Sequence, residues 1–332
     1  MGHRKKHAPK RGSLAYLPRG RAKRWEARIR FWPKIEEKPK LLAFSGYKAG
    51  MTHLVSVDNR KGSLSFGKEV VVPVTVIESP PLVVCAVRAY EEGPAGLRAL
   101  TEAWAENFPK DLNRLLTPPN ASRAQEALRK IETSLEKIRE IRVLATTQPR
   151  LASVPRKTPE IMEIKVSGGT LKEQFEYAKG ILGKEVKSSD VFQEGQWVDV
   201  ASISKGKGIQ GPVKRWGVRI LSHKSRKTIR GVGSIGPWTP AYVTYTVPRA
   251  GQTGFHQRTS YNQQIMKIGE DGTEVTPKGG FGRYGPINGS YMILAGSVHG
   301  PSRRLVALRH AVRASPGPAS APKIEHLSLH TK

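Results

Sequence analysis

The chain contains 332 residues, of which 56 are Lys or Arg and 27 are Asp or Glu, so its formal charge at pH 7 is +29. A hydrophobic content of 38% is sufficient for a folded core, and the length suits about two domains or one domain with long insertions. The apolar runs are far shorter than the roughly 18–20 residues that span a bilayer, and a single cysteine, Cys85, excludes an internal disulfide and a cysteine-based metal site.

The excess of positive charge indicates a polyanionic partner, because a charge of +29 opposes compaction by self-repulsion. Binding to an anionic membrane would favour an amphipathic basic helix, but the basic stretches are rich in Gly, Pro and Ser, which break helices. Nucleic acid is the better partner, since phosphate contacts need only Lys and Arg. The N-terminus lacks the apolar stretch of a signal peptide, so we expect a cytoplasmic protein without membrane association.

Residues 1–40 have the composition of an extended basic arm. They contain 14 Lys or Arg and three Glu, a net charge of +11, and four prolines interrupt them. Such a segment buries too little apolar surface to fold by itself, and a solvated tail is the simplest interpretation. However, Trp25 and Trp32 lie among the basic residues, and aromatic rings interleaved with arginine suit the stacking of unpaired RNA bases. We therefore predict that this arm binds RNA.

Short β-branched runs separated by Gly and Pro predict a mainly β core. Runs of about five to nine residues with this punctuation are typical of the strands of a barrel or sandwich. The predicted strands are 69–77, 82–89, 141–147, 161–166, 197–203, 242–247, 264–268, 291–298 and 304–308. The predicted barrel core comprises residues 41–90, 141–203 and 261–310, and residues 311–332 form a C-terminal tail.

Two capping boxes predict helices. One begins at Ser122 and precedes apolar residues at helical spacing, and the other begins at Thr170 and opens a helix that Gly183 ends. Residues 91–140, with nine acidic and eight basic side chains, are therefore predicted to form a helical insertion that faces solvent or another protein. The fold class that follows is mainly β with an α insertion.

Residues 204–260 are predicted to form a long basic loop. The surrounding segment 200–269 contains twelve Lys or Arg and no Asp or Glu, and Gly, Pro, Ser and Thr dominate it. An ordinary water-facing surface mixes both signs of charge, and a long irregular insertion in a compact domain is usually functional or disordered. We expect the loop to penetrate folded RNA and to become ordered there.

Trp238 stands in the loop sequence Gly-Pro-Trp-Thr-Pro. One interpretation is a tryptophan that folds back onto the barrel. The other is a stacking or wedging tip, which the flanking prolines hold stiffly because they restrict φ. The sequence leaves both open.

The remaining motifs fail on their context. Residues 206–211 match G-x-G-x-x-G, but Pro212 follows at once and no acidic residue occurs before Glu270, so we reject a dinucleotide site. His326 and His330 have the spacing of metal ligands on a helix, but they lie in a tail without Cys or an acidic cluster. No nucleophile elbow is present. We predict no metal and no cofactor.

Two other classes of protein compete with an RNA-binding structural component. A free nucleic-acid enzyme or nucleotide-binding factor has only the failed glycine motif as support. A chromatin-like packaging protein would explain the charge, but neither the β core nor the proline-fixed tryptophan.

Five stretches together resemble ribosomal protein L3 of the archaeal and eukaryotic type. They are residues 3–19, 44–53, 205–217, 235–241 and 249–259. They occur in the order of that family between residue 3 and about residue 310, and the stretches FSGYKAGMTH and RAGQTGFHQRT are the most specific.

The resemblance implies a structural protein of the large ribosomal subunit that binds rRNA early in assembly and is not an enzyme. It also implies a translation-protein-type β-barrel with a basic arm and an internal loop that penetrates RNA. In that family the tryptophan-bearing tip approaches the peptidyl transferase centre, and Trp238 has the matching position. The implied partners are large-subunit (23S-type) rRNA and neighbouring large-subunit proteins, and the chain would be a monomer within the cytoplasmic ribosome.

The predicted rRNA-binding residues are basic, aromatic and histidine side chains of the arm, the loop and the 44–53 stretch. They are Arg4, Lys5, Lys6, Lys10, Arg11, Arg19, Arg21, Lys23, Arg24, Trp25, Arg28, Lys48, Lys205, Lys207, Lys214, Arg215, Trp216, Lys224, Arg226, Lys227, Arg230, Trp238, Arg249, His256 and Arg258.

Overall fold

The computed structural model describes residues 11–117, 119, 123–314 and 320–329. The chain forms two compact units. One consists of Met1–Arg24 and Ile203–Gln257, and the other of Trp25–Ser202 and Arg258–Lys332. We call the first the loop unit and the second the barrel unit. The loop unit thus combines the first part of the predicted arm with most of the predicted internal loop.

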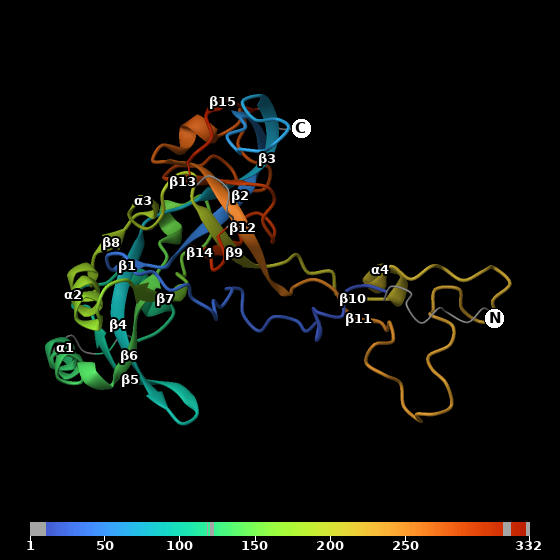
Figure 1. Cartoon of the computed structure of the whole chain (residues 1–332), viewed down its shortest axis with the longest axis horizontal. Helices are drawn as coiled ribbons and strands as arrows, with labels where there is room; N and C mark the ends of the chain where they lie inside the picture. The colour runs from blue at the N-terminus through green and yellow to red at the C-terminus, as the bar shows by residue number, and fades with distance from the viewer. Residues whose placement is uncertain (1–10, 118, 120–122, 315–319, 330–332) are drawn as a thin grey trace. The chain divides into compact units, whose positions relative to one another are not determined.

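A ring of six strands forms the centre of the barrel unit (Figure 1). These strands are β2 (Ala43–Val57), β3 (Glu69–Glu78), β9 (Trp197–Ile203), β12 (Gln257–Gly269), β13 (Tyr291–Ala295) and β14 (Leu305–His310). The hydrogen-bonded order β2, β3, β13, β12, β9, β14 returns to β2, so the sheet closes on itself as a barrel. The 15-residue strand β2 pairs with β14 near its start and with β15 (Ile324–Leu327) near its end.

Strand β13 shows how the core of the barrel unit is built. Tyr291 and Ile293 belong to one cluster of buried side chains, and Met292 and Leu294 belong to another. Successive side chains of a strand point to opposite faces, so both faces of β13 are covered. Burial on both faces explains why this strand is a continuous apolar run without alternating polar residues.

A second sheet packs in the same unit. Its strands are β1 (Lys40–Leu41), β4 (Leu82–Gly93), β5 (Gly96–Trp104), β6 (Ile138–Thr146), β7 (Ile161–Ser167) and β8 (Glu185–Val186). The helix α2 (Leu171–Ile181) contacts β4, β6 and β7, and α1 (Ala124–Thr133) contacts β5. Phe175 and Ala178 of α2 join Ile141 of β6 in one buried cluster, which also includes barrel residues such as Phe44. The second sheet and the barrel therefore share a core.

Short elements complete the described part of the chain. They are α3 (Ser188–Val191), α4 (Pro212–Trp216), β10 (Ile209–Gln210), β11 (Gly251–Gln252) and the 3-10 helices η1 (Lys110–Arg114), η3 (Leu135–Lys137), η4 (Pro149–Leu151) and η5 (Gly272–Val275). No helix among the described residues is long and apolar enough to cross a bilayer.

The mainly β class with a few helices is confirmed, and eight of the nine predicted strands coincide with observed ones. The prediction of a strand at 242–247 was wrong, because this β-branched segment has no strand partner and forms turns. The strands at 82–93, 138–146 and 161–167, which we placed in the barrel, form the second sheet. Local patterns identify a strand, whereas the choice of partner depends on the whole fold.

The predicted helical insertion is only partly helical. Residues 96–104 form β5, which pairs with β4 in a hairpin, and the helix α1 ends at Thr133. The expected cap Ser122 lies outside the described residues. The other capping box is confirmed: the Thr170 hydroxyl accepts a hydrogen bond from Glu173 N (3.4 Å), and the Glu173 carboxylate accepts one from Thr170 N (3.3 Å).

Candidate nucleic-acid interface

Two short strands join the two ends of the internal loop. Ile209 pairs with Gln252 and Gln210 with Gly251, so β10 and β11 form the base of the loop unit. Beside them, Gly254 adopts a left-handed φ of +72°, and a Cβ atom there would lie 2.0 Å from the carbonyl oxygen of Lys205. Because the two backbone segments approach so closely, only glycine fits at position 254, which lies within the 249–259 stretch.

The helix α4 begins with Pro212 and ends before Gly217, which adopts a left-handed φ of +65°. We had taken Pro212 as an obstacle to a helix, and this was wrong, because proline is well suited to the first helical position, where no N–H partner is needed. The helix has only five residues. The segment contains no acidic residue before Glu270, so the rejection of a dinucleotide site now rests on the missing acidic residue alone.

Trp216, the last residue of α4, is the anchor of the loop unit. Its side chain is only 6% exposed, and its indole N–H donates to the carbonyl oxygen of Arg249 at 3.0 Å. The guanidinium groups of Arg19 and Arg215 lie 3.9 Å and 5.3 Å from the ring centroid. Gly12 approaches the ring so closely that a Cβ atom there would lie 2.7 Å from it. The indole therefore joins the arm to the loop.

His256 is a second internal contact between arm and loop. Its Nδ1 lies 2.8 Å from the carbonyl oxygen of Gly20, and its Nε2 accepts a hydrogen bond from Gly254 N at 3.1 Å. An accepting Nε2 places the proton of the neutral ring on Nδ1, which donates to Gly20. The backbone N–H of Ala22 also donates to the carbonyl oxygen of Phe255 (2.8 Å). Both ring nitrogens of His256 are thus bonded inside the protein.

Most of the other predicted RNA-binding side chains are exposed. The exposed ones are Arg11, Arg21, Lys23, Arg24, Trp25, Arg28, Lys205, Lys207, Lys214, Lys224, Arg226, Lys227, Arg230, Trp238 and Arg249. Those partly covered are Arg19, Arg215 and Arg258. Those buried are Lys48, Trp216 and His256. Arg4, Lys5, Lys6 and Lys10 lie outside the described residues.

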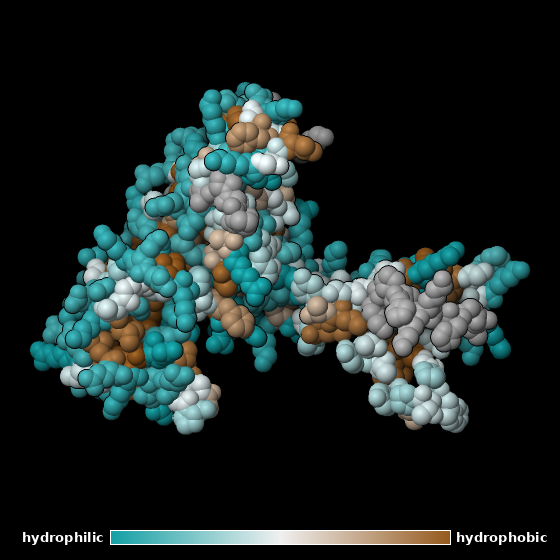
Figure 2. Space-filling model, in the orientation of Figure 1, coloured by the Kyte–Doolittle hydropathy of each residue, from teal (hydrophilic) through white to brown (hydrophobic). Residues whose placement is uncertain are grey.

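The segment between Arg230 and Arg249 has a different chemistry from the rest of the loop. None of its 18 residues is charged, and it carries the exposed rings of Trp238, Tyr242 and Tyr245. Trp238 is 96% exposed, so its ring does not fold back onto the protein. Figure 2 shows hydrophobic and hydrophilic residues side by side on the loop unit. The sequence left two interpretations of Trp238 open, and the exposed ring favours the stacking tip.

Four predicted residues, Trp25, Arg28, Lys48 and Arg258, lie in the barrel unit. Trp25 has the guanidinium of Arg304 5.0 Å from its ring centroid. The buried ammonium of Lys48 donates to the carbonyl oxygens of Val298 (2.5 Å) and Gly300 (3.3 Å). Arg258 and Lys48 lie close enough to His299 to lower its pKa, although partial burial of that ring is the larger cause.

The 297–304 loop carries basic side chains that sequence reasoning missed, of which His299 and Arg303 are exposed and Arg304 is buried. It contributes His299, Arg303 and Arg304, and its backbone bonds to that of Lys48 through Arg303 N (2.8 Å) and Arg304 O (3.0 Å). The pair Arg303-Arg304 was the available signal. It was overlooked because it lies outside the two basic blocks and because Arg304 is the first residue of the predicted strand 304–308.

The outer ion pairs of the second sheet give a charge-balanced face. Arg88 pairs with Glu102 (2.7 Å), Arg142 with Glu163 (3.1 Å) and Lys165 with Glu140 (2.8 Å). Burial opposes the charge of Glu140, but Lys165 and Arg142 hold the pKa of its carboxyl below the ordinary value. Since the cationic side chains of this face are paired with carboxylates, the face is unsuited to phosphate binding. The described residues contain no group of three or more His, Cys, Asp or Glu that could hold a metal ion.

Comparison with known proteins fits this geometry. The family model described as "Ribosomal protein L3" matches residues 1–331. The chain belongs to the ribosomal protein L3 family. It is 50% identical over 331 residues to "Large ribosomal subunit protein uL3" of Methanothermobacter thermautotrophicus, which covers 98% of each chain. The protein of the same name from Methanothrix thermoacetophila is 50% identical over 329 residues (98% and 97% of the two chains), and that from Methanopyrus kandleri is 49% identical over 334 residues (98% and 92%).

The stretches that carried the resemblance to the L3 family occupy defined places in the fold. Residues 44–53 lie on β2, the strand that pairs with both β3 and β14 to close the barrel. Residues 249–259 include β11, Gly254 and His256, and continue into β12. Both stretches therefore build the scaffold more than they present side chains to a partner.

Proposed function

We propose that this chain is a structural constituent of the large ribosomal subunit that binds large-subunit rRNA. The L3 family consists of structural ribosomal proteins and not of enzymes. The observation that carries the proposal is the family match over residues 1–331, and the exposed basic side chains of the loop unit supply a matching surface. The segment between Asp199 and Glu270 contains no carboxylate that could compete with RNA phosphates for its own cations.

The residues of the arm and loop divide into two roles. The exposed Lys and Arg side chains would bind phosphates, while Trp216 and His256 hold the two segments together from inside. A joined arm and loop offer many phosphate contacts at once, which suits a protein that binds rRNA early in assembly. The barrel would remain at the subunit surface.

The uncharged segment around Trp238 would act differently. With no Lys or Arg between 231 and 248, it can contribute stacking and shape but no phosphate contacts. From the resemblance to the tryptophan-bearing tip of the L3 family, Trp238 would lie near the peptidyl transferase centre. There the chemistry belongs to RNA, and the tryptophan would only support its structure.

The partners that follow are 23S-type rRNA and neighbouring large-subunit proteins, with the chain present as a monomer in the cytoplasmic ribosome. The charge-balanced second sheet suits a protein neighbour or solvent better than RNA. No cofactor has a role in this function.

A salt titration of binding to large-subunit rRNA tests the proposal. If a third of the 14 basic residues in 1–40 and the twelve in 200–269 neutralise phosphates, the slope of log K against log salt is about −6 to −8. Replacing Arg226 and Lys227 with Ala should make the slope shallower by about 1.5–2. The matched control is Arg129→Ala with Lys130→Ala on α1, which removes the same charge and should leave the slope unchanged. A parent slope shallower than about −2 would contradict the proposal.

A further inference from the structure

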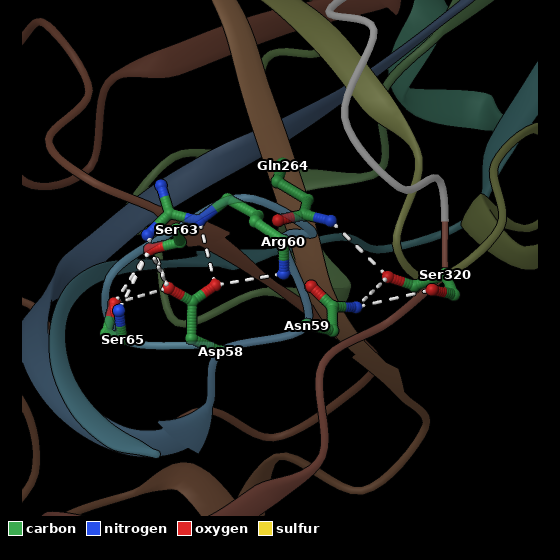
Figure 3. Close-up of polar contacts among 7 residues, drawn as sticks. All are labelled: Asp58, Asn59, Arg60, Ser63, Ser65, Gln264 and Ser320. Carbon is green, nitrogen blue, oxygen red and sulfur yellow. Dashed lines mark hydrogen bonds and ion pairs between the residues drawn. The ribbon is translucent and has the colours of Figure 1, made fainter. Parts of the chain in front are cut away.

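The loop between β2 and β3, residues 58–68, has a closed and ordered form (Figure 3). Two backbone hydrogen bonds join its ends, from Asp58 N to Lys68 O (3.0 Å) and from Gly67 N to Asp58 O (2.8 Å). Within it, Ser63 N donates to Arg60 O and Phe66 N to Ser63 O, each at 3.1 Å. Compact surface loops with adjoining ends are frequently functional.

The buried carboxylate of Asp58 is the centre of this loop. It accepts hydrogen bonds from Arg60 N (3.0 Å), Nε (2.9 Å) and Nη2 (3.0 Å), and from the hydroxyls of Ser63 (2.8 Å) and Ser65 (2.6 Å) (Figure 3). The bonds from Arg60, followed by those from the serines, hold the pKa of Asp58 well below its usual range. Five donors on one carboxylate fix the conformation of the loop before any partner binds.

A second contact fixes the base of the loop. Asn59 Nδ2 donates to the carbonyl oxygen (3.0 Å) and hydroxyl (3.3 Å) of Ser320, a residue of the C-terminal segment. The same carbonyl oxygen accepts a bond from Gln264 Nε2 of β12 at 3.5 Å (Figure 3). The loop is therefore tied to the barrel as well as closed on itself.

The apolar side chains of the loop point away from its polar centre. Leu64 lies between Ser63 and Ser65, whose hydroxyls both turn to Asp58, and it is 101% exposed. Phe66, two residues further on, is 54% exposed. Single exposed apolar residues are common on protein surfaces. Here, however, the hydrogen bonds to Asp58 fix a loop on which both a leucine and a phenylalanine are exposed to water.

We propose that Leu64 and Phe66 form a docking site for a neighbouring protein, which receives them in an apolar pocket bordered by carboxylates. This inference rests on the proposed function, since the neighbour would be another protein of the large subunit. A loop already fixed in its bound form loses little conformational entropy on binding. Lys61 precedes and Lys68 follows the apolar pair in the sequence, and both are exposed, so they would complement carboxylates at the rim of the pocket.

Two features favour a protein over RNA as the occupant. Leu64, which is fully exposed, has no ring face on which a base can stack, so the half-exposed Phe66 offers the one ring of this apolar pair. The guanidinium of Arg60 donates through Nε and Nη2 to Asp58, so this edge of the guanidinium is not available for a phosphate.

Photo-crosslinking in assembled large subunits tests this docking site. The full chain carrying Leu64→p-benzoylphenylalanine is incorporated into subunits, which are purified and irradiated. We expect one dominant adduct with a single protein, resistant to RNase. An adduct that RNase removes would show RNA contact and overturn the inference, and so would the absence of any adduct. The same probe at exposed Leu97, at the tip of the β4–β5 hairpin, serves as the position control and should not give that adduct.

Two variants separate docking from folding. Asp58→Asn keeps both apolar side chains but weakens the network, and should lower the yield of the adduct several-fold. Leu64→Ser with Phe66→Ser should reduce the amount of the same neighbour in purified subunits, measured by quantitative mass spectrometry, about tenfold. Incorporation of the chain itself is measured in the same gradients. Failure of the parent chain to enter subunits contradicts the proposed function. Normal entry of the double variant with an unchanged amount of the neighbour contradicts only the docking site.

Discussion

The guanidinium of Arg19 lies 3.9 Å from the centroid of the Trp216 ring and donates a hydrogen bond to the carbonyl oxygen of Arg215 at 3.0 Å. These residues are almost 200 positions apart in the sequence, one in the basic arm and the other in the internal loop. Stacking a guanidinium on an indole lets two positively charged segments approach each other, because the ring face attracts cations. The arm and the loop thereby form one unit.

Trp216→Ala should loosen this unit. Removing a buried tryptophan costs about 3–5 kcal/mol, so we expect the free energy that protects the Ala22 and Gly217 amides from hydrogen exchange to fall by about that amount or to the limit of detection. Trp216→Phe keeps a ring for Arg19 but removes the donor to Arg249 and part of the buried ring, so its loss should be smaller than that of Trp216→Ala, about 1–2 kcal/mol. Unchanged exchange at Ala22 in Trp216→Ala would show that the indole does not join the two segments.

Trp238→Ala should behave in the opposite way. The ring is almost fully exposed, so the free energy of unfolding of the free protein should change by less than about 0.5 kcal/mol. In assembled subunits the loss should amount to about 1–3 kcal/mol of local contact, visible as altered binding of tRNA or of a peptidyl transferase inhibitor. Arg24→Ala with Arg28→Ala is the contrasting variant and should weaken incorporation. A Trp238→Ala protein that unfolds when free, while its subunits work normally, would contradict the exposed-tip interpretation.

Asp199→Ala should destabilise the barrel. Asp199 of β9 and Arg309 of β14 are cross-strand partners, with Arg309 Nη2 3.0 Å from Asp199 Oδ2, and both side chains are buried. Leaving Arg309 buried without its carboxylate costs about 3–5 kcal/mol, measurable by urea unfolding. Asp199→Leu with Arg309→Met should restore much of this loss, since an apolar pair can replace a buried ion pair. Equal losses in the single and the double variant would argue against a specific pair.

His310 should make the barrel unit sensitive to mild acid. Burial, followed by the nearby charge of Lys40, lowers the pKa of His310 to about 4 from an ordinary value of 6.5. The unfolded chain therefore binds a proton below about pH 6.5 that the folded chain takes up only near pH 4, so stability falls as the pH drops through this window. Between pH 7 and pH 5 the loss is about 2 kcal/mol in urea unfolding. His310→Gln should remove this part of the pH dependence, whereas the control His299→Gln should retain it.

Strands could be predicted from the sequence where the pattern is local, but one long strand was missed. β2 contains Gly46 and Gly50, which weaken the strand signal. The structure gives the reason for both: a Cβ at 46 would lie 2.6 Å from the carbonyl oxygen of Glu78, and one at 50 would lie 2.5 Å from the Phe281 ring. These glycines permit close packing with segments far away in the sequence, which no local pattern reveals.

The sequence composition predicted where the candidate site lies in the chain, but it did not predict which of its side chains are exposed and which are buried. Charge and glycine content located the loop. However, the residue types of Trp216, His256 and Lys48 occur both as exposed RNA contacts and as buried structural groups, so the sequence alone could not distinguish the two roles. Their burial depends on the hydrogen bonds to Arg249, Gly20 and Val298, which lie 33, 236 and 250 positions away. Conversely, the flanking prolines made a stiff tip one of the two interpretations of Trp238, and the exposure of its ring favours that one.

Sedimentation of a cell extract through a sucrose gradient at moderate salt is the most direct test of the central claim, that the chain is a structural component of the large ribosomal subunit. The account predicts that the full chain co-migrates with large subunits in about one copy per subunit and leaves no sizeable free pool. A chain that sediments mainly as free protein, or with DNA, while intact large subunits lack it, would contradict the account.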